Sequence, residues 1–249
     1  MPYAGDGDAF LMERFYKRWC RASDLVKYDV VIKESELFVM TSVDLRDKAF
    51  SALSKYRKDI EEYIRLNPEF LDALGPIEVD KEAPEIVKEM VCNSGRVNVG
   101  PMASVAGAIA EYVGNNLLKY CSEVIIENGG DIFMASGKER VIAIYAGKSI
   151  FSGKLGIRMV PGMMPAGVCT SSGTVGHSLS FGKADAVVVV SKSAIFADAA
   201  ATYFANLVKS EKDIGGVIEK SKEFEEIMGI VVIKGDKMGV WGKLELVEI

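Results

Sequence analysis

Two oxygen-bearing side chains, Asp198 and Thr202, stand four residues apart in a run of alanines. Side chains at this spacing share one face of a helix, and the small neighbours Ala197 and Ala199–Ala201 leave that face open. A carboxylate and a hydroxyl suit Mg²⁺, which takes its other oxygens from water and substrate phosphates. In the simpler alternative, Thr202 bonds the carbonyl of residue 198 and Asp198 faces solvent. The spacing by itself favours this alternative.

A second polar segment, CTSSGTVGHS, covers residues 169–178 and is rich in hydroxyls and glycines. Its hydroxyl and N–H groups could bind a polar ligand, or it could be a turn-rich connection between strands. It holds the single histidine of the sequence, His177, which excludes a histidine-rich metal site. Nucleophilic catalysis would need His177 with Cys169, Ser171 or Ser172, but there is no G-x-S-x-G motif. Cys169 is more simply a small buried apolar residue.

A third candidate is VIIENGGDIF, in which two apolar runs flank Asn128, Gly129, Gly130 and Asp131. Asn-Gly between such runs predicts a tight hairpin turn. The second glycine lets backbone come close to a ligand, and a carboxylate beyond the turn can accept hydrogen bonds from that ligand. The residues alone leave open whether a ligand also binds at this turn.

The composition excludes several classes of protein. Of the 249 residues, 49% are hydrophobic and 26% are charged, as in ordinary soluble proteins, and the net charge of −5 predicts no nucleic-acid-binding face. Neither common nucleotide-binding glycine motif is present. No apolar run is long enough to span a membrane, and the first residues lack the pattern of a secretory signal. With four widely spaced cysteines, we expect a cytoplasmic protein with reduced thiols.

Apolar periodicity predicts the elements that must position these candidates. Strand patterns occur over residues 27–35, 36–42, 122–127, 132–136, 140–147, 167–173 and 184–192, and in a closing hairpin around Gly235-Asp236. Helical patterns occur over residues 44–67, 68–76, 83–95, 99–120, 193–210 and 213–229. Strands and helices come in blocks rather than alternating, which predicts an α+β fold with mixed or antiparallel sheets. One domain over residues 1–249, with room for two lobes, fits this order.

In chain order, three blocks resemble the ApbE family, the FAD:protein FMN transferases, and most closely its cytoplasmic branch that lacks a signal peptide. The first block is NVGPMASVAGAIAEYVGNNLL, residues 98–118, and the second is the triplet Gly129-Gly130-Asp131. The third runs from TSSG through a histidine to ADAVVVVSKSAIFADAAAT, ending at Thr202. The resemblance covers about residues 95–210 and implies a single ApbE-like, T-fold-like domain.

The resemblance also implies roles for the candidate residues. Asp198 and Thr202 would hold Mg²⁺ against the diphosphate of FAD, with a backbone carbonyl near Gly100 as a further ligand. His177 would lie in the same cleft as a weak candidate for orienting the substrate or transferring a proton. The implied nucleotide pocket contains Asn98, Gly100, Ser104, Asn128, Gly129, Gly130, Asp131, Thr170, Ser171, Ser172 and Gly173.

Two departures from the family pattern leave the reaction open. Asn98 replaces an aspartate of the family, and Ser104 replaces a lysine that would be a cation near the phosphates. One hypothesis is binding of FAD or a related nucleotide with Mg²⁺, followed by transfer of FMN to a hydroxyl acceptor. The alternative is a non-flavin small-molecule binding protein or enzyme that keeps the fold but has lost flavin transfer. In a third interpretation, an oligomeric scaffold without a site, the small-residue helix at 101–115 is an interface; a homo-oligomer stays open.

Overall fold

A computed structural model describes residues 22–173 and 182–249 of the protein. Within this part, one sheet has eight strands in the order β1-β2-β3-β4-β7-β8-β9-β10, and a smaller sheet has the order β11-β6-β5. The strands are β1 (Val26–Ile32), β2 (Ser35–Thr41), β3 (Val124–Asn128), β4 (Asp131–Ala135), β5 (Arg140–Ala143), β6 (Leu155–Met159), β7 (Ala166–Ser171), β8 (Ala186–Ser191), β9 (Ile227–Lys234), β10 (Lys237–Gly242) and β11 (Glu245–Glu248).

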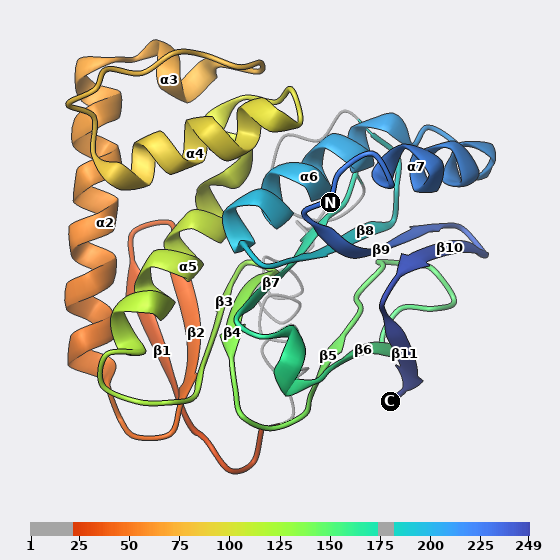
Figure 1. Ribbon diagram of the computed structural model, residues 1–249, viewed down its shortest axis with the longest axis horizontal. Helices are drawn as coiled ribbons and strands as arrows, with labels where there is room; N and C mark the ends of the chain where they lie inside the picture. Colours follow the sequence, from red (N-terminus) through yellow and green to blue (C-terminus); the bar gives the residue numbers. More distant parts are fainter. Residues whose placement is uncertain (1–21, 174–181) are drawn as a thin grey trace, which may run out of the picture.

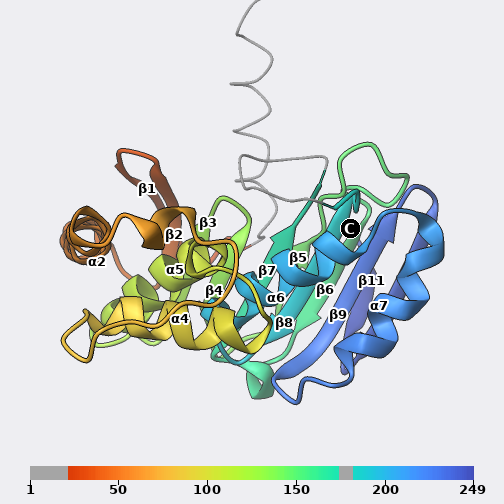
Figure 2. The same ribbon diagram turned by 90° about the horizontal axis from the view of Figure 1, so that it is seen from above.

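The helices lie together on one face of the large sheet, and the small sheet covers the opposite face (Figures 1 and 2). The helices are α2 (Arg46–Leu66), α3 (Glu69–Asp72), α4 (Glu85–Arg96), α5 (Val105–Leu117), α6 (Ala194–Leu207) and α7 (Ile214–Ser221), with short 3₁₀ turns η2 (Pro101–Ser104), η3 (Pro161–Met163) and η4 (Glu211–Asp213). Because strand side chains alternate between faces, the strands of the large sheet other than the edge strand β1 contribute to two separate apolar cores.

The predicted α+β class is confirmed, and the pairings among the described strands are antiparallel. The strand patterns at residues 27–35 and 36–42 pair as β1–β2, and both predicted hairpin turns form, at Gly129-Gly130 between β3 and β4 and around Gly235, whose φ of +64° suits glycine. Ser193, the first residue of the helix predicted over residues 193–210, is the N-cap of α6, and its hydroxyl accepts a hydrogen bond from the Phe196 N–H group. Strong periodicity therefore located the larger elements correctly.

Two expectations about the second half of the chain were wrong or incomplete. The helix expected over residues 213–229 is only α7, because the apolar run from Ile227 onward enters the sheet as β9. The small sheet was not predicted, since β6 carries a glycine and an arginine in its apolar run and β11 is only four residues long. Neither β6 nor β11 has a clear strand pattern of its own, and their pairing with each other identifies them as strands.

Helices α5 and α6 approach one another closely because small residues line their contact. A Cβ atom added at Gly107 of α5 would lie 2.2 Å from the Ala194 carbonyl oxygen of α6. One at Gly167 of β7 would lie 2.2 Å from the Cα atom of Ala194, and one at Gly114 would meet the Phe133 ring. The small-residue face of α5 is thus covered by this chain's own elements, which argues against its use as an interface in a scaffold.

Candidate functional site

Asp198 lies at the crossing of α5 and α6 and is only 8% exposed. Its Oδ2 atom accepts a hydrogen bond of 2.9 Å from the backbone N–H of Gly107 in the first turn of α5. The free N–H groups at a helix start need an acceptor, and no side chain at the start of α5 caps it. Asp198 therefore does not face solvent, and the simpler interpretation is wrong on this point.

Asp131, the first residue of β4, is the second buried carboxylate at this crossing, with 8% exposure. Its Oδ1 atom accepts a hydrogen bond of 3.3 Å from the backbone N–H of Thr170 near the end of β7. Asp131 shares the helix-side face of β4 with Phe133, which packs against α5. The sheet and the two helices thus bring two predicted site residues together from distant parts of the sequence.

Both carboxyl groups are harder to ionise than exposed ones, mainly because they are buried. Burial raises the pKa of Asp198 to about 7, despite bonds from the N–H groups of Gly107 and Ala106. Burial also raises the pKa of Asp131 well above its ordinary value, and the nearby charge of Asp198 raises it further. Within residues 22–173 and 182–249, neither carboxylate has a lysine or arginine partner. A cation would relieve this repulsion.

Cys169 is fully buried beside these carboxylates and donates a hydrogen bond of 3.4 Å from its Sγ atom to the Ala194 carbonyl. Burial raises the pKa of its thiol well above the ordinary value, and the charges of Asp131 and Asp198 act in the same direction. The thiolate is the nucleophilic form of cysteine. Cys169 is therefore a packing residue, as its sequence context indicated.

Two further hydroxyls lie on β7 and α6, the elements that contact these carboxylates. Ser171 is 5% exposed, and its Oγ atom has no hydrogen-bond partner among the described residues. It lies two residues beyond Cys169 on β7, so the alternation of the strand turns it toward α6. Thr202 follows Asp198 by one helical turn and is half-buried. Buried polar groups normally have partners, so the unpartnered Ser171 hydroxyl indicates a place for a ligand atom.

The predicted turn stands at the edge of this cluster. Gly129 and Gly130 form the two-residue loop with φ of +64° and +106°, while Asn128 and Asp131 are the pair that closes the hairpin. The Nδ2 atom of Asn128 donates a hydrogen bond of 3.1 Å to the Ala106 carbonyl, so it joins the turn to α5. No atom lies within 4 Å of where a Cβ of either glycine would stand, and this leaves the loop open to a ligand.

Three predicted site residues precede α5 and make no hydrogen bond with Asp131 or Asp198. Ser104 is buried, and its hydroxyl donates to the Pro101 and Met90 carbonyls. Gly100 is pressed against α3, since an added Cβ would meet the Ala73 carbonyl, and its own carbonyl accepts from Ala103. Asn98 is exposed, with φ of +56°, a conformation that asparagine and aspartate tolerate well.

The polar segment after β7 is described only in part. Ser172 donates from Oγ to the Ala184 carbonyl at 3.4 Å, and the Gly173 N–H donates to the same carbonyl at 3.0 Å. Gly173 packs against Gly182, where a Cβ atom would have no room. His177 lies outside the described residues, so its expected role stays a prediction.

Sequence analysis missed one residue of this region, Glu111. Its Oε2 atom accepts hydrogen bonds from the N–H groups of Ala194 and Ile195 at 2.6 and 3.2 Å and from the Ser193 hydroxyl at 3.0 Å. Burial raises the pKa of Glu111, although these bonds oppose the shift. A signal was available, because Glu111 is the one charged residue in the sequence of α5.

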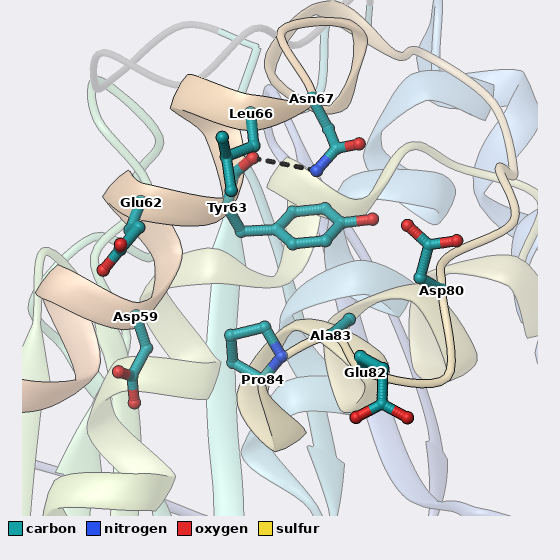
Figure 3. A pocket seen from close by; sticks show the side chains of 9 residues that line it. All are labelled: Asp59, Glu62, Tyr63, Leu66, Asn67, Asp80, Glu82, Ala83 and Pro84. Carbon is teal, nitrogen blue, oxygen red and sulfur yellow. Dashed lines mark hydrogen bonds between the residues drawn. The ribbon is translucent and has the colours of Figure 1, made fainter.

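Two surface depressions of the described chain lie elsewhere. One, of about 270 Å³, lies between the end of α2 and the segment before α4, where four acidic side chains surround Tyr63 (Figure 3). Its acidic residues are Asp59, Glu62, Asp80 and Glu82. The other is lined by residues 44–48. Neither contains a predicted site residue.

The oxygen donors at the α5–α6 crossing fit Mg²⁺ better than a softer metal. No group of three or more histidine, cysteine or acidic side chains in the described chain could hold a metal by itself. Mg²⁺ commonly uses one or two carboxylates and completes its shell with water and substrate phosphates. Asp198, Thr202 and the unpartnered Ser171 hydroxyl would supply only part of such a shell, and water and substrate phosphates would supply the rest.

A family model described as "AbpE bacteria" matches residues 17–222 of the chain. The chain belongs to this family. The ApbE resemblance inferred from three short blocks is therefore confirmed over most of the sequence. Among the relatives, the UPF0280 protein of Methanocaldococcus jannaschii is 44% identical over 231 residues, which cover 89% of this chain and 93% of that protein.

Solved ApbE structures share the fold of this family member. The flavinyl transferase ApbE of Pseudomonas stutzeri superimposes with a TM-score of 0.59 at 15% identity, over 90% of this chain and 94% of that one. The ApbE protein of Thermotoga maritima gives the same TM-score at 11% identity, over 86% and 96%. At such low identity the agreement establishes the fold. Within the described residues, no helix has the length and apolarity to cross a bilayer.

Proposed function

We propose that this ApbE-like protein binds FAD or a related nucleotide together with Mg²⁺ and transfers FMN to a hydroxyl acceptor. The observation that carries the proposal is the pair of buried carboxylates, Asp131 and Asp198, together with an unpartnered Ser171 hydroxyl on β7. Membership of the family supports it, and the ApbE of Pseudomonas stutzeri, which shares the fold, is a flavinyl transferase.

Asp198 and Thr202 would hold the metal, and Asp131 would add negative charge beside it. When bound, Mg²⁺ would neutralise diphosphate oxygens and stabilise the AMP leaving group. The open glycine loop at Gly129 and Gly130 would admit the nucleotide close to backbone. Asn128, by holding the Ala106 carbonyl, would keep that loop against the start of α5.

In the proposed transfer, an acceptor hydroxyl forms a new bond to the FMN phosphorus while the bond from that phosphorus to the AMP oxygen breaks. The hydroxyl proton must leave, and His177 is the residue of the sequence whose pKa range suits this. The thiol of Cys169 takes no part, because burial and two neighbouring carboxylates keep it protonated.

The alternative, a non-flavin ligand on the same fold, is favoured by one observation. Ser104, which stands where the family has lysine, directs its hydroxyl to the Pro101 and Met90 carbonyls inside the protein. It therefore supplies no cation for a phosphate. Asn98 is a milder change, since its left-handed backbone conformation suits asparagine and aspartate alike.

A melting scan of the purified protein against FAD, FMN, ADP and Mg²⁺, alone and in pairs, tests the proposal. A ligand at a hundredfold its Kd stabilises by about 2.7 kcal/mol, which shifts the melting temperature measurably. We expect the largest shift with FAD and Mg²⁺ together, and release of AMP when a threonine peptide is added. A shift without AMP would contradict transfer, and no shift with any flavin would favour the alternative.

A further inference from the structure

Helices α5 and α6 cap one another in a closed ring of hydrogen bonds. From α6, Asp198 accepts from the Gly107 N–H group at the start of α5. From α5, Glu111 accepts from the Ala194 and Ile195 N–H groups at the start of α6. Gly107 and Glu111 are four residues apart, as are Ala194 and Asp198, so each side of the ring is one helical turn.

The contacts around this ring restrict movement of the first turns of α5 and α6. Ser193 accepts from the third free N–H group of α6, that of Phe196, and donates to Glu111. Ala194 is enclosed between Gly107 and Gly167, with no room for a Cβ at either glycine. A displacement of the first turn of α6 must therefore move Asp198 and Thr202, one and two turns further along the same helix.

We propose that Glu111 is a positioning residue for Asp198 and Thr202, the proposed metal ligands on α6. It acts through the first turn of α6 and not by touching the nucleotide. This inference rests on the proposed function. Partners that orient metal ligands typically matter by 10–100-fold in metal affinity. The ring predicts that loss of Glu111 is felt in two places, at its own bonds on α6 and, through Asp198, at the start of α5.

The test compares E111A and E111Q in the full chain. Glutamine keeps an acceptor oxygen for the Ala194 N–H group, whereas alanine keeps none. The matched control is D213A, because Asp213 accepts from the Lys209 and Ser210 N–H groups in another helix cap remote from the ring. Circular dichroism identifies the temperatures at which all variants are folded.

The first readout is amide hydrogen exchange without any ligand. We expect E111A to speed exchange at Ala194 and Ile195 and also at Ala106 and Gly107, with E111Q close to wild type and D213A unchanged at these amides. Faster exchange confined to α6 would overturn the coupling between the two helix starts.

The second readout is the Mg²⁺-dependent affinity for FAD. We expect about a tenfold or greater loss in E111A, recovery to within about threefold in E111Q, and no loss in D213A. An equal loss in D213A would mean that lower stability, and not positioning, is the cause. If wild type binds no FAD, the proposed function fails, but the exchange readout still decides whether the ring exists.

Discussion

Two regions of this protein hold neighbouring carboxylates in opposite ways. Near β5, Asp24 and Glu123 face Arg140, whose guanidinium is 5% exposed and bonds both of them. At the α5–α6 crossing, Asp131 and Asp198 face backbone N–H groups and each other. The first region is neutralised by the protein itself, whereas the second has no cation among the described residues.

The pKa values follow this difference. Bonds from Arg140 and Lys138 hold the pKa of Asp24 well below its ordinary value. Burial pushes the pKa of Glu123 up, but bonds from Arg140 and Ser136 outweigh it and leave the pKa lowered. Asp198 and Asp131 are shifted upward instead, first by burial. A group that costs stability in the free protein is typical of a functional site.

The largest expected effect comes from removing the cation of the satisfied region. R140M leaves the exposed Asp24 carboxylate and the 12% exposed Glu123 carboxylate without their partner, and we expect a larger loss in the free energy of unfolding than in any other variant, chiefly through Glu123. Urea denaturation measures it. The matched control is R158M, since Arg158 pairs with Glu139 and Glu245 at the surface, where about 1 kcal/mol or less is expected. Equal losses would contradict the comparison.

The carboxylates around Arg140 should make the protein less stable as pH falls, which is the opposite of the trend expected for Asp198. Asp24 and Glu123 have lowered folded pKa values, so their stabilisation is present above the unfolded values of about 3.9 and 4.3 and is lost as pH falls. Urea midpoints between pH 6 and pH 3 should therefore fall more steeply for wild type than for R140M. Parallel curves would remove the role assigned to Arg140.

The smallest effect on stability is expected at Ser171. S171A removes a buried hydroxyl without a partner, so the free energy of unfolding should stay unchanged or rise by about 1 kcal/mol. S193A is the control, because it removes the N-cap of α6 and should cost about 1 kcal/mol. A loss in S171A as large as that in S193A would show that Ser171 stabilises the fold and is not reserved for a ligand.

Local signals explain which parts of the fold could be predicted. The β3–β4 and β9–β10 turns carry glycines where φ is positive, and α2 and α6 have clear helical periodicity. The small sheet could not be predicted, because β6 and β11 are short and depend on pairing across almost the whole C-terminal half.

The candidate site, too, could be predicted only in part from the sequence. Spacing placed Asp198 and Thr202 on one helix, but it could not foresee that Asp198 is buried, because its partner Gly107 lies 91 residues away in sequence. The family resemblance, not the residue pattern, singled out Asp131 as a site residue. The burial that matters for its pKa comes from the packing of α5, α6 and β7, which no local pattern encodes.

In the proposed site, Asp198 is kept for a cation at a cost to the stability of the free protein. Its folded pKa is raised to about 7, so the stabilisation linked to its proton is lost as pH rises through that value. Asparagine keeps an acceptor for the Gly107 N–H group but carries no charge. The most direct measurement is therefore the melting temperature of wild type and D198N at pH 8, each with and without Mg²⁺ and FAD. We expect D198N to be at least as stable as wild type without ligand and to show no Mg²⁺-dependent shift. A less stable D198N that keeps the full shift would contradict the claim and make Asp198 a structural cap alone.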